Sequence, residues 1–433
     1  MEDYFMKKIS VIIIGAGNRG ERYATHMTEN PEKYEIVGMA DPDEARRRHF
    51  QESFGVPADN CFASWEEILA RPKMADVAVI ATVDNMHYDP ALLAIDKGYD
   101  LLLEKPVAQT ARECADIAAA AQKKGVRVLV CHVLRYSPFY GKIKELVMSG
   151  IIGKIVSIDQ VEGIGNVHFG HSYVRGNWHS EEESTPMLLA KSCHDLDIIQ
   201  WLLDKPCKQV ASFGSLVHFK PENAPEGAPV RCADGGCPVA DTCPYNCIRQ
   251  YHDNKTNTRR MIITKGIAKD FVPTDEEVLT ALRTTDYGLC VYHANNDVLD
   301  HQVVSMEFEG GATANLTVNA FNKGGRYIRI YGTEGELYAH MSDTQIRVYT
   351  FADNKVQMIP VMKTEESING GHGGGDEGII KELHEYLSDT YTGFRAADIT
   401  TSVKNHLIGF AAEQARHGKR VVSMDEVMKK YGF

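Results

Sequence analysis

The chain has 433 residues, more than one ordinary domain, and its 43% apolar and 24% charged residues are typical of a globular protein. The formal net charge of −12 argues against nucleic acid or an anionic membrane as the main partner, because both require a basic protein surface. No segment resembles a transmembrane helix. The N-terminal residues MEDYFMKK carry two acids and no apolar signal core, so we expect a cytoplasmic protein.

The first predicted element is a strand followed by a glycine-rich turn. The apolar run Ile9–Ile14 is too short for a buried helix and rich in β-branched residues, which predicts a strand of a buried parallel sheet. It leads into Gly15-Ala16-Gly17-Asn18-Arg19-Gly20, a G-x-G-x-x-G turn. Such turns bring a dinucleotide pyrophosphate against the backbone and the N-terminus of the next helix. A glycine-rich loop without a ligand is the alternative, because the motif alone is weakly specific.

An acidic residue at the end of the second predicted strand strengthens the dinucleotide interpretation. This strand, Tyr34–Ala40, leads into Asp41, 21 positions after Gly20, where dinucleotide-binding folds place the acid that binds the adenosine ribose. Because Asp41 would repel a 2′-phosphate, we expect NAD to be preferred over NADP. We place the basic run 46–48 on the solvated face of the following helix.

Strands and helices alternate through the first 131 residues, which predicts an α/β Rossmann domain over 1–131. A polar loop, Thr82–His87, follows the third strand at a carboxyl end, where open α/β sheets bind ligands. The remaining elements expected here are helices at 43–54, 90–97 and 112–123 and strands at 76–81, 99–103 and 126–130.

The pattern changes after residue 131, where β-rich segments are separated by Gly-, Asn- and Asp-containing turns. We expect residues 132–433 to form an α+β domain whose largely antiparallel open sheet packs on helices through one face. The predicted strands are 155–161, 301–308, 312–319, 327–331 and 345–351. A glycine-rich loop is expected around 370–376, and a helix at Ser402–His417 is expected to close the chain.

Several of these motifs occur together in one order. Gly15-Ala16-Gly17, Asp41, Asn85-x-His87 and Glu104-Lys105-Pro106 together resemble the Gfo/Idh/MocA oxidoreductases, which use nicotinamide cofactors on sugars, inositols and related polyols. Later segments agree with this resemblance: Arg135-Tyr136-Ser137-Pro138, Gly150–Lys154, His194-Asp195-Leu196-Asp197 and Gly332–Gly335.

The resemblance implies which residues bind the cofactor and that the chain forms an oligomer. The implied cofactor-binding residues are Gly15, Ala16, Gly17, Asn18, Arg19, Gly20, Asp41, Asn85, His87, Glu104 and Lys105. Because family members pair subunits through the open face of the second sheet, the resemblance also implies a homo-oligomer, a dimer or a tetramer.

Oxidation of a sugar alcohol needs a group that moves the hydroxyl proton while a hydride leaves. By resemblance, Lys105 points at the substrate hydroxyl, although a lysine at a strand end is more often a surface residue. The second candidate is His194, on a helix predicted at Pro186–Leu203 with Thr185 as its N-cap. Many family members carry an aspartate four positions earlier, where this chain has Ala190; Lys191 shares the predicted helix face and is our third catalytic candidate.

The substrate site is expected near a segment rich in hydrogen-bonding and aromatic side chains, 169–178, for which a merely tethered loop is an equally good interpretation. A second segment, 292–297, is a weaker candidate and is expected to open a strand. The candidate substrate-binding residues are Arg135, Tyr136, His171, Arg175, Trp178 and His293.

Four of the ten cysteines lie in a short stretch rich in proline and glycine. In a cytoplasmic chain we expect reduced thiols or metal ligands rather than disulfides. Cys232, Cys237, Cys243 and Cys247 predict a structural zinc site within an insertion at 218–253, with His218 as a possible substitute ligand. Their spacings differ from paired C-x-x-C motifs, so free thiols in an insertion remain the alternative.

Three functions follow from these motifs. The first is an NAD-dependent sugar or polyol dehydrogenase that transfers a hydride from a hydroxyl-bearing carbon. The second is an NAD-dependent glycoside hydrolase that oxidises the sugar transiently and breaks the glycosidic bond by elimination. The third is a non-catalytic dinucleotide- or sugar-binding regulator, against which the intact Glu104-Lys105-Pro106 motif and His194 argue.

Overall fold

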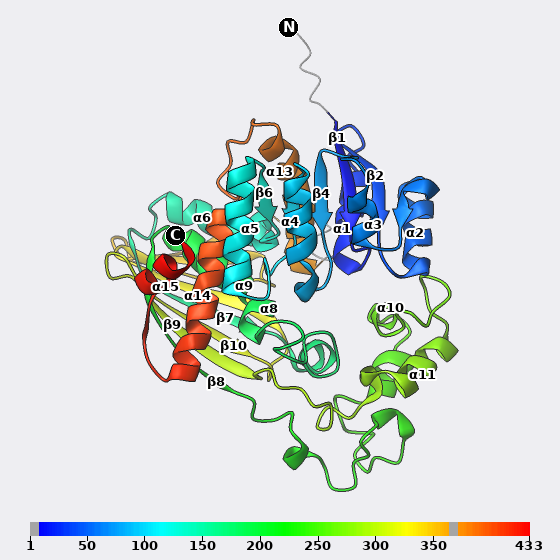
Figure 1. Cartoon of the computed structure of the whole chain (residues 1–433). Helices are drawn as coiled ribbons and strands as arrows, with labels where there is room; N and C mark the ends of the chain where they lie inside the picture. Colours follow the sequence, from blue (N-terminus) through cyan, green and yellow to red (C-terminus); the bar gives the residue numbers. More distant parts are fainter. Residues whose placement is uncertain (1–7, 363–370) are drawn as a thin grey trace.

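The computed structural model describes residues 8–362 and 371–433, which form two β-sheets with helices around them (Figure 1). The first sheet has six parallel strands in the order β3-β2-β1-β4-β5-β6. The predicted Rossmann fold is therefore confirmed. Its strands are β1 (Ile9–Ile14), β2 (Tyr34–Ala40), β3 (Cys61–Phe62), β4 (Val77–Ile80), β5 (Asp100–Leu103) and β6 (Val128–Val130).

Helices connect these parallel strands, and local sequence sets where they begin. The Asp43 side chain accepts the Arg46 N–H at the start of α2, and Thr110 forms a capping box with Glu113 at the start of α5. The predicted helices lie within one or two residues of the observed ones, whereas the short β3 and α3 were not predicted. The helices are α1 (Asn18–Thr28), α2 (Glu44–Phe54), α3 (Trp65–Ala70), α4 (Tyr88–Asp96) and α5 (Ala111–Lys124).

The second sheet has nine strands in the order β14-β13-β12-β11-β7-β10-β9-β8-β15 and is antiparallel except for the β7–β10 pair. The predicted open sheet is confirmed, and its alternating burial follows the alternating sequence pattern. Its strands are β7 (Ile155–Gly163), β8 (Cys207–Ser215), β9 (His301–Phe308), β10 (Thr313–Asn319), β11 (Gly325–Gly332), β12 (Gly335–His340), β13 (Gln345–Thr350), β14 (Lys355–Pro360) and β15 (Val422–Ser423).

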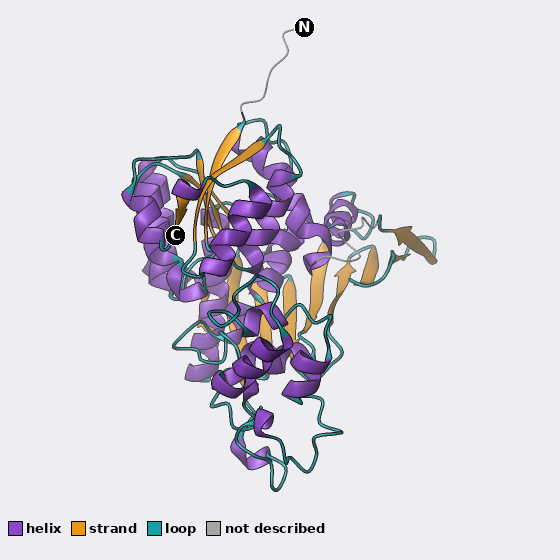
Figure 2. Cartoon of the chain, turned by 90° about the vertical axis from the view of Figure 1, so that its right-hand side faces the viewer, coloured by secondary structure: helices purple, strands orange, loops and turns teal. Residues whose placement is uncertain are grey.

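Helices cover one face of this second sheet and join it to the first (Figures 1 and 2). Helix α14 packs on β8 and on α5, and the buried residues of α13 belong to the same core as β1 and β2. The predicted closing helix is α14, but a further helix, α15, follows it. The helices are α6 (Pro138–Met148), α7 (Asn166–Phe169), α8 (Met187–Ala190), α9 (Cys193–Leu203), α13 (Gly375–Leu387), α14 (Ile399–Gly418) and α15 (Met424–Tyr431). The division at residue 131 stays a prediction.

A long segment, residues 216–300, connects the neighbouring strands β8 and β9, and we call it the β8–β9 segment. It is larger than the insertion predicted at 218–253. It holds α10 (Arg260–Ile263) and α11 (Asp275–Thr284), which lie below α2 in Figure 1. Buried residues such as Tyr251, Val278 and Leu282 give it a small core of its own. The segment therefore brings additional structure to the edge of the Rossmann domain.

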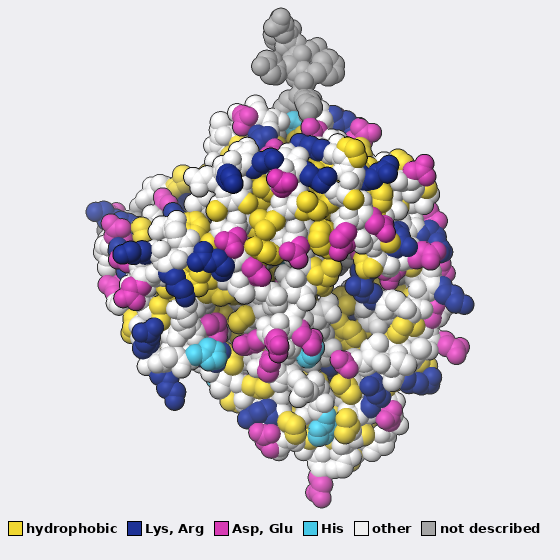
Figure 3. All heavy atoms as spheres, in the orientation of Figure 1, with side chains coloured by type: hydrophobic (Ala, Val, Ile, Leu, Met, Phe, Trp, Pro, Cys, Tyr) yellow, Lys and Arg dark blue, Asp and Glu magenta, His cyan; other side chains and the backbone are white. Residues whose placement is uncertain are grey.

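Basic and acidic side chains are interspersed over the molecular face in Figure 3. Within residues 8–362 and 371–433, no helix has both the length and the apolar character needed to cross a lipid bilayer.

Candidate active site

The glycine-rich turn joins β1 to α1 and needs glycine at two positions. Gly15 has φ +96°, and a Cβ there would lie 2.5 Å from the Ala81 carbonyl oxygen. A Cβ on Gly20 would lie 2.0 Å from the Gly15 carbonyl oxygen, so glycine allows α1 to pack close to the turn. Helix α1 begins at Asn18, after Gly17, which supplies no side-chain cap. Its first N–H groups can therefore receive an anion such as a pyrophosphate.

Asp41 lies beside this turn, as the sequence predicts. It is 4% exposed, and its carboxylate accepts hydrogen bonds from the Ala16 N–H at 2.8 Å and the Asp43 N–H at 2.9 Å. A carboxylate has about four acceptor positions, so these two bonds leave acceptor capacity for ribose hydroxyls. The turn, the α1 N-terminus and Asp41 together fit a dinucleotide.

The arginines of α2 are not placed as predicted, because only Arg48 lies on the exposed face. An Arg46 Nη1 atom lies 3.9 Å from Asp41, and Arg46 helps to line the cavity over Gly17. Arg47 donates a 2.7 Å hydrogen bond to the Asp41 carbonyl. The Asp41 carboxylate attracts Arg46, and the Asp41 backbone carbonyl holds Arg47. The predicted nucleotide site therefore carries one positive charge, on Arg46, that the sequence pattern assigned to solvent, and Arg47 lies beside it.

The β8–β9 segment covers the same cavity from the opposite side. Residues of the glycine-rich turn and of α2 form one wall, and residues 258–271 form the other. The rings of His49 and Phe271 stack with centroids 3.8 Å apart, and the Gly266 N–H donates to Asp43 at 3.1 Å. The candidate nucleotide site is therefore enclosed by a part of the chain that lies more than 200 residues away in sequence.

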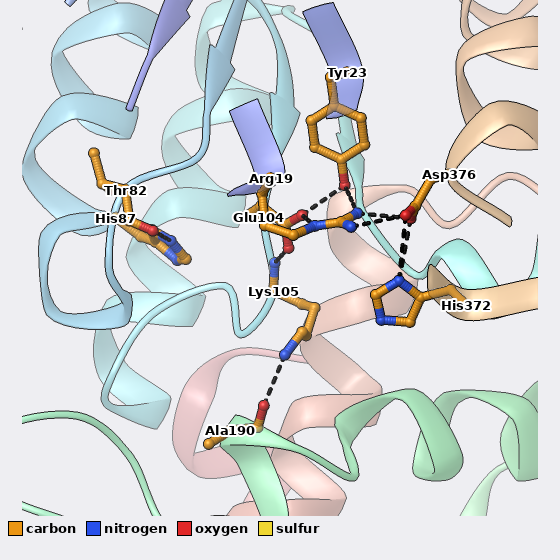
Figure 4. Close-up of polar contacts among 9 residues, drawn as sticks. All are labelled: Arg19, Tyr23, Thr82, His87, Glu104, Lys105, Ala190, His372 and Asp376. Atoms are coloured by element: carbon orange, nitrogen blue, oxygen red, sulfur yellow. Dashed lines mark hydrogen bonds and ion pairs between the residues drawn. The ribbon is translucent and has the colours of Figure 1, made fainter. Parts of the chain in front are cut away.

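A buried ionic network lies at the end of β5 (Figure 4). Arg19 Nε donates to Glu104 at 2.6 Å, and the Arg19 guanidinium donates two further bonds to Asp376, at 2.9 and 2.8 Å. Tyr23 donates to the same Glu104 oxygen at 2.5 Å. Arg19 offsets the burial of Glu104 and holds the pKa of this carboxyl below its usual range. Arg19 and Glu104, both predicted to bind cofactor, thus have charged partners within the protein.

Lys105 follows Glu104 and extends toward the second domain. Its backbone N–H donates to Glu104 at 3.0 Å, while its ammonium donates to the Ala190 carbonyl at 2.7 Å (Figure 4). Residue Ala190 occupies the position where the resemblance implies an aspartate. A backbone carbonyl thus supplies the oxygen partner that the missing side chain would have offered.

The single helix predicted over 186–203 is wrong, because the chain is broken between α8 and α9. Lys191 has φ −112° and ψ −56°, and Ser192 has φ −97° and ψ 9°, outside regular helix geometry. The predicted cap is also wrong, because Thr185 Oγ1 donates to Asp84 at 3.3 Å instead. The break leaves the Ala190 carbonyl at a helix end, where Lys105 can satisfy it.

His194 lies in the first turn of α9 and is 2% exposed. Its ring centroid lies 5.9 Å from that of His132 and 5.3 Å from that of His372. Within the described residues, neither ring nitrogen of His194 has a hydrogen-bond partner. Burial holds the pKa of His194 well below its ordinary value, and repulsion by Lys105 and His372 lowers it further. His194 is therefore neutral, and both of its ring nitrogens are buried without a hydrogen-bond partner among the described residues.

Lys191 pairs with a different group from the one predicted. Its ammonium lies 3.4 Å from Glu162, which also contacts Arg326 at 2.6 Å. Arg326 in turn donates to Asp195 at 3.0 Å. Burial lowers the pKa of Lys191, although Glu162 opposes this shift. Because the helix is broken at Lys191, this side chain turns toward β7 rather than toward His194.

Asp84 is a site residue that the sequence prediction missed. It is 6% exposed and accepts a 2.9 Å hydrogen bond from Trp178 Nε1. Burial raises the pKa of the Asp84 carboxyl, whereas the charge of Lys105 lowers it. A cavity of about 520 Å³ lies beside it, lined by residues that include Asn85, Trp178 and Tyr287. Its position next to the Asn85-x-His87 motif was the available signal.

Several predicted substrate residues have partners elsewhere in the protein. Arg135 is 3% exposed and donates to both oxygens of Asp197 at 2.7 and 2.6 Å, and Tyr136 is 5% exposed and lies in the Rossmann core. Arg135, which follows β6, therefore forms an ion pair with Asp197 of α9. Both side chains thus have contacts within the protein, and their role in substrate binding stays a prediction.

Residues 169–178 divide between the cavity and the β8–β9 segment. Trp178 lines the cavity, as does Arg175, but the Arg175 guanidinium donates to the carbonyls of Leu289 and Tyr245 at 2.7 and 2.9 Å. His171 contacts the Tyr251 hydroxyl at 2.8 Å. Burial lowers the pKa of His171 to about 3, so its ring is neutral.

The structure bears on two further predictions near the site. The cofactor role of His87 stays a prediction, whereas the strand expected at 292–297 is wrong. His87 is 1% exposed, and its ring nitrogens contact the carbonyls of Pro106 at 2.7 Å and Thr82 at 3.2 Å, so it joins two loops of the Rossmann domain. The segment containing His293 is a loop and does not open a strand, because β9 begins at His301.

The predicted zinc site is not supported. In the described parts of the chain, no group of three or more His, Cys, Asp or Glu side chains is arranged to hold a metal ion. Cys232 and Cys247 do lie together, with the Cys247 N–H donating to Cys232 Sγ at 3.5 Å. His218 instead contacts the Tyr292 hydroxyl at 3.1 Å. None of the ten cysteines forms a disulfide.

Comparison with known proteins gives two family matches that together span most of the chain. Residues 9–132 match the model GFO_IDH_MocA, described as an oxidoreductase family with an NAD-binding Rossmann fold. Residues 144–424 match the model GFO_IDH_MocA_C, described as the C-terminal alpha/beta domain of that oxidoreductase family.

Individual relatives are distant. The putative oxidoreductase YteT of Bacillus subtilis is 26% identical over 383 residues, which cover 84% of this chain and 83% of YteT. An inositol 2-dehydrogenase/D-chiro-inositol 3-dehydrogenase of Lactiplantibacillus plantarum is 23% identical over 46% of this chain and 54% of its own. The structure of levoglucosan dehydrogenase in complex with NADH and levoglucosan aligns with a TM-score of 0.70 at 15% identity, covering 96% of this chain and 100% of the other.

Proposed function

The chain belongs to the Gfo/Idh/MocA family of oxidoreductases, and on this premise we propose that it is an NAD-dependent dehydrogenase of a sugar, glycoside or cyclic polyol. One observation carries the proposal. The Lys105 ammonium lies at the carboxyl end of β5, held by the Ala190 carbonyl, next to the buried Asp84 and the unpartnered ring of His194. Such a group can polarise a hydroxyl at the edge of the sheet where Rossmann folds bind their ligands.

NAD would be held by the turn at 15–20, the α1 N-terminus, Asp41 and the cationic side chain of Arg46. When bound, it supplies the hydride acceptor for the oxidation. Lys105 donates a hydrogen bond to the reacting oxygen, and the buried Asp84 carboxyl and the neutral ring of His194 lie beside Lys105. The buried surroundings strengthen these interactions because little water screens them.

The polar character of the neighbouring cavity supports a carbohydrate or polyol substrate. Its lining includes Asn85, Trp178, Glu183 and Asp286, which together offer hydrogen-bonding groups and an aromatic face. The inositol dehydrogenase relative and the levoglucosan complex of a structural neighbour agree with this class of substrate, at low identity. The direct test is a panel of sugars, glycosides and polyols, assayed with NAD for the appearance of NADH and of the keto product.

A second candidate is the NAD-dependent glycoside hydrolase, in which the cofactor is reduced and reoxidised within one turnover. The cover formed by residues 258–271 over the nucleotide site favours it, because an enclosed cofactor need not leave between turnovers. Phe271→Ala would remove the stack on His49 and should accelerate cofactor release, measured by stopped-flow fluorescence; Val272→Ala, at a 74% exposed neighbour, is the matched control. Release of a free sugar without NADH would select this candidate over the dehydrogenase.

We also propose that the chain forms a homo-oligomer, a dimer or a tetramer, through the open face of the second sheet. Large apolar side chains are exposed on this face, among them Phe213 at 72%, Val303 at 41% and Tyr327 at 39%. Phe213 and Val303 lie directly opposite each other on β8 and β9, so the exposed groups form a continuous patch there. Sedimentation of the wild type and of Phe213→Lys tests this assembly.

A further inference from the structure

His372 lies in the glycine-rich loop before α13 and comes close to His194, although no catalytic role follows from its sequence position. Its backbone has φ +58° and ψ +20°, a left-handed conformation that is uncommon for any residue other than glycine. Gly373 and Gly374, which follow it, also have positive φ. The loop thus turns sharply and carries one imidazole into the region of Lys105 and His194.

One nitrogen of this imidazole has a fixed partner. His372 Nδ1 lies 3.2 Å from Asp376 Oδ1, and Asp376 is only 1% exposed. Arg19 donates to both Asp376 oxygens, which fixes the carboxylate in the network that ends at Glu104 and Lys105 (Figure 4). The carboxylate accepts a hydrogen bond from Nδ1–H, so neutral His372 presents the lone pair of Nε2. This is the arrangement in which a carboxylate orients a histidine base.

His372 also has better access than His194. Its side chain is 26% exposed, whereas His194 is 2% exposed and lies deeper in α9. Figure 4 shows the His372 ring and the Lys105 side chain extending to the same side of Arg19. The charged and titratable groups around His372 are Asp376 on α13, Arg19 on α1, Lys191 after α8 and His194 on α9. Of these, only Asp376 favours protonation.

We infer that His372 is the general base of the reaction, and that Asp376 is the residue that positions it. The inference rests on the proposed function. As the substrate is oxidised, its O–H bond breaks and the proton forms a bond to His372 Nε2, while its C–H electron pair leaves as hydride to the bound nicotinamide and the C=O bond forms. Lys105 remains an ammonium and donates a hydrogen bond to the oxygen. The proton then leaves His372 for solvent through its exposed edge.

The experiment compares His372→Gln, Asp376→Asn and the control His340→Gln, whose imidazole lies on β12 and contacts Ser342. His372→Gln should lower kcat by about 10²–10⁴-fold and leave NAD affinity within about twofold, because general base assistance is worth that much. Imidazole added to His372→Ala should restore part of the rate. His340→Gln should retain wild-type kinetics. Unchanged kcat in His372→Gln with an active wild type would overturn the inference while leaving the proposed function intact.

A second readout needs no turnover. Nitrogen-15 NMR of the labelled histidines, assigned with His372→Gln, should find His372 as the Nδ1–H tautomer at high pH. Asp376→Asn should shift its titration to lower pH, because the positive charge loses its nearest partner. An Nε2–H tautomer, or a titration unmoved by Asp376→Asn, would overturn the inference. Absence of turnover by the wild type on every substrate would instead contradict the proposed function, and the base assignment with it.

Discussion

The ammonium of Lys105 donates a 2.7 Å hydrogen bond to the backbone carbonyl of Ala190, which lies at the break between α8 and α9. This bond connects the end of a Rossmann strand to the second domain at the candidate active site. The interrupted helix leaves a backbone carbonyl free to accept this hydrogen bond, where a side-chain aspartate would have offered a charged acceptor. The base of the reaction can then come from another part of the chain.

The cofactor preference is the first prediction. NAD should bind at least several-fold more tightly than NADP, because Asp41 accepts bonds from ribose hydroxyls and repels a 2′-phosphate. Asp41→Asn should weaken NAD binding and reduce the preference for NAD over NADP. Adding Arg46→Ala to this variant should weaken NADP binding. Calorimetric titration of both cofactors measures this, and a wild-type preference for NADP would show that Arg46 and Arg47 outweigh Asp41.

The second prediction concerns a different group of buried charges, in which Arg326 contacts both Glu162 and Asp195. Arg326→Met should lower the free energy of unfolding by about 3–5 kcal/mol, because it leaves the buried carboxylates of Glu162 and Asp195 without their shared cation. Lys191→Met should cost only about 1 kcal/mol, because Glu162 keeps Arg326. Urea unfolding of both variants tests the ranking. Equal losses would mean that Lys191 compensates these acids as much as Arg326 does.

Most of the strands could be predicted because their residues are buried in a regular pattern. Strand β1 is apolar at every position except Ser10, and β9 alternates buried residues with more exposed ones. Strand β3 has only two residues, and β14 is exposed along nearly its whole length, so neither has a hydrophobic period to detect.

The site could be predicted only in part, because its remaining contacts join distant positions. The motif with Lys105 is local, but the break after Ala190 and the contact of Lys191 with Glu162 are not visible in the sequence pattern. The hydrogen bond between Trp178 and Asp84 joins residues that are 94 positions apart in sequence. The bond between Arg19 and Asp376 spans 357 positions. The cysteine prediction is not supported either, because these residues are close in sequence but are not arranged in the described structure as a group that could hold a metal ion.

The third prediction is a pH dependence of stability. Burial and, next, repulsion by Glu413 raise the pKa of Glu181 from 4.5 to about 7. Between these values the folded chain binds more protons than the unfolded chain, so this carboxyl makes the free energy of unfolding fall as pH rises from 4.5 to about 7. In the wild type this carboxyl should lower the free energy of unfolding by about 1–3 kcal/mol over this pH range, and Glu181→Gln should abolish that decrease. Denaturation at several pH values tests it; identical slopes in wild type and variant would contradict it.

The most direct test of the whole account is the turnover of wild type and Lys105→Ala on one substrate with NAD. Lys97→Ala is the matched control, because Lys97 also donates to a backbone carbonyl, at 3.0 Å, but on the surface. We expect NAD-dependent conversion of a sugar or polyol by the wild type and by Lys97→Ala, and a kcat about 10²–10⁴-fold lower in Lys105→Ala at nearly unchanged NAD affinity. Wild-type turnover in Lys105→Ala would contradict the account.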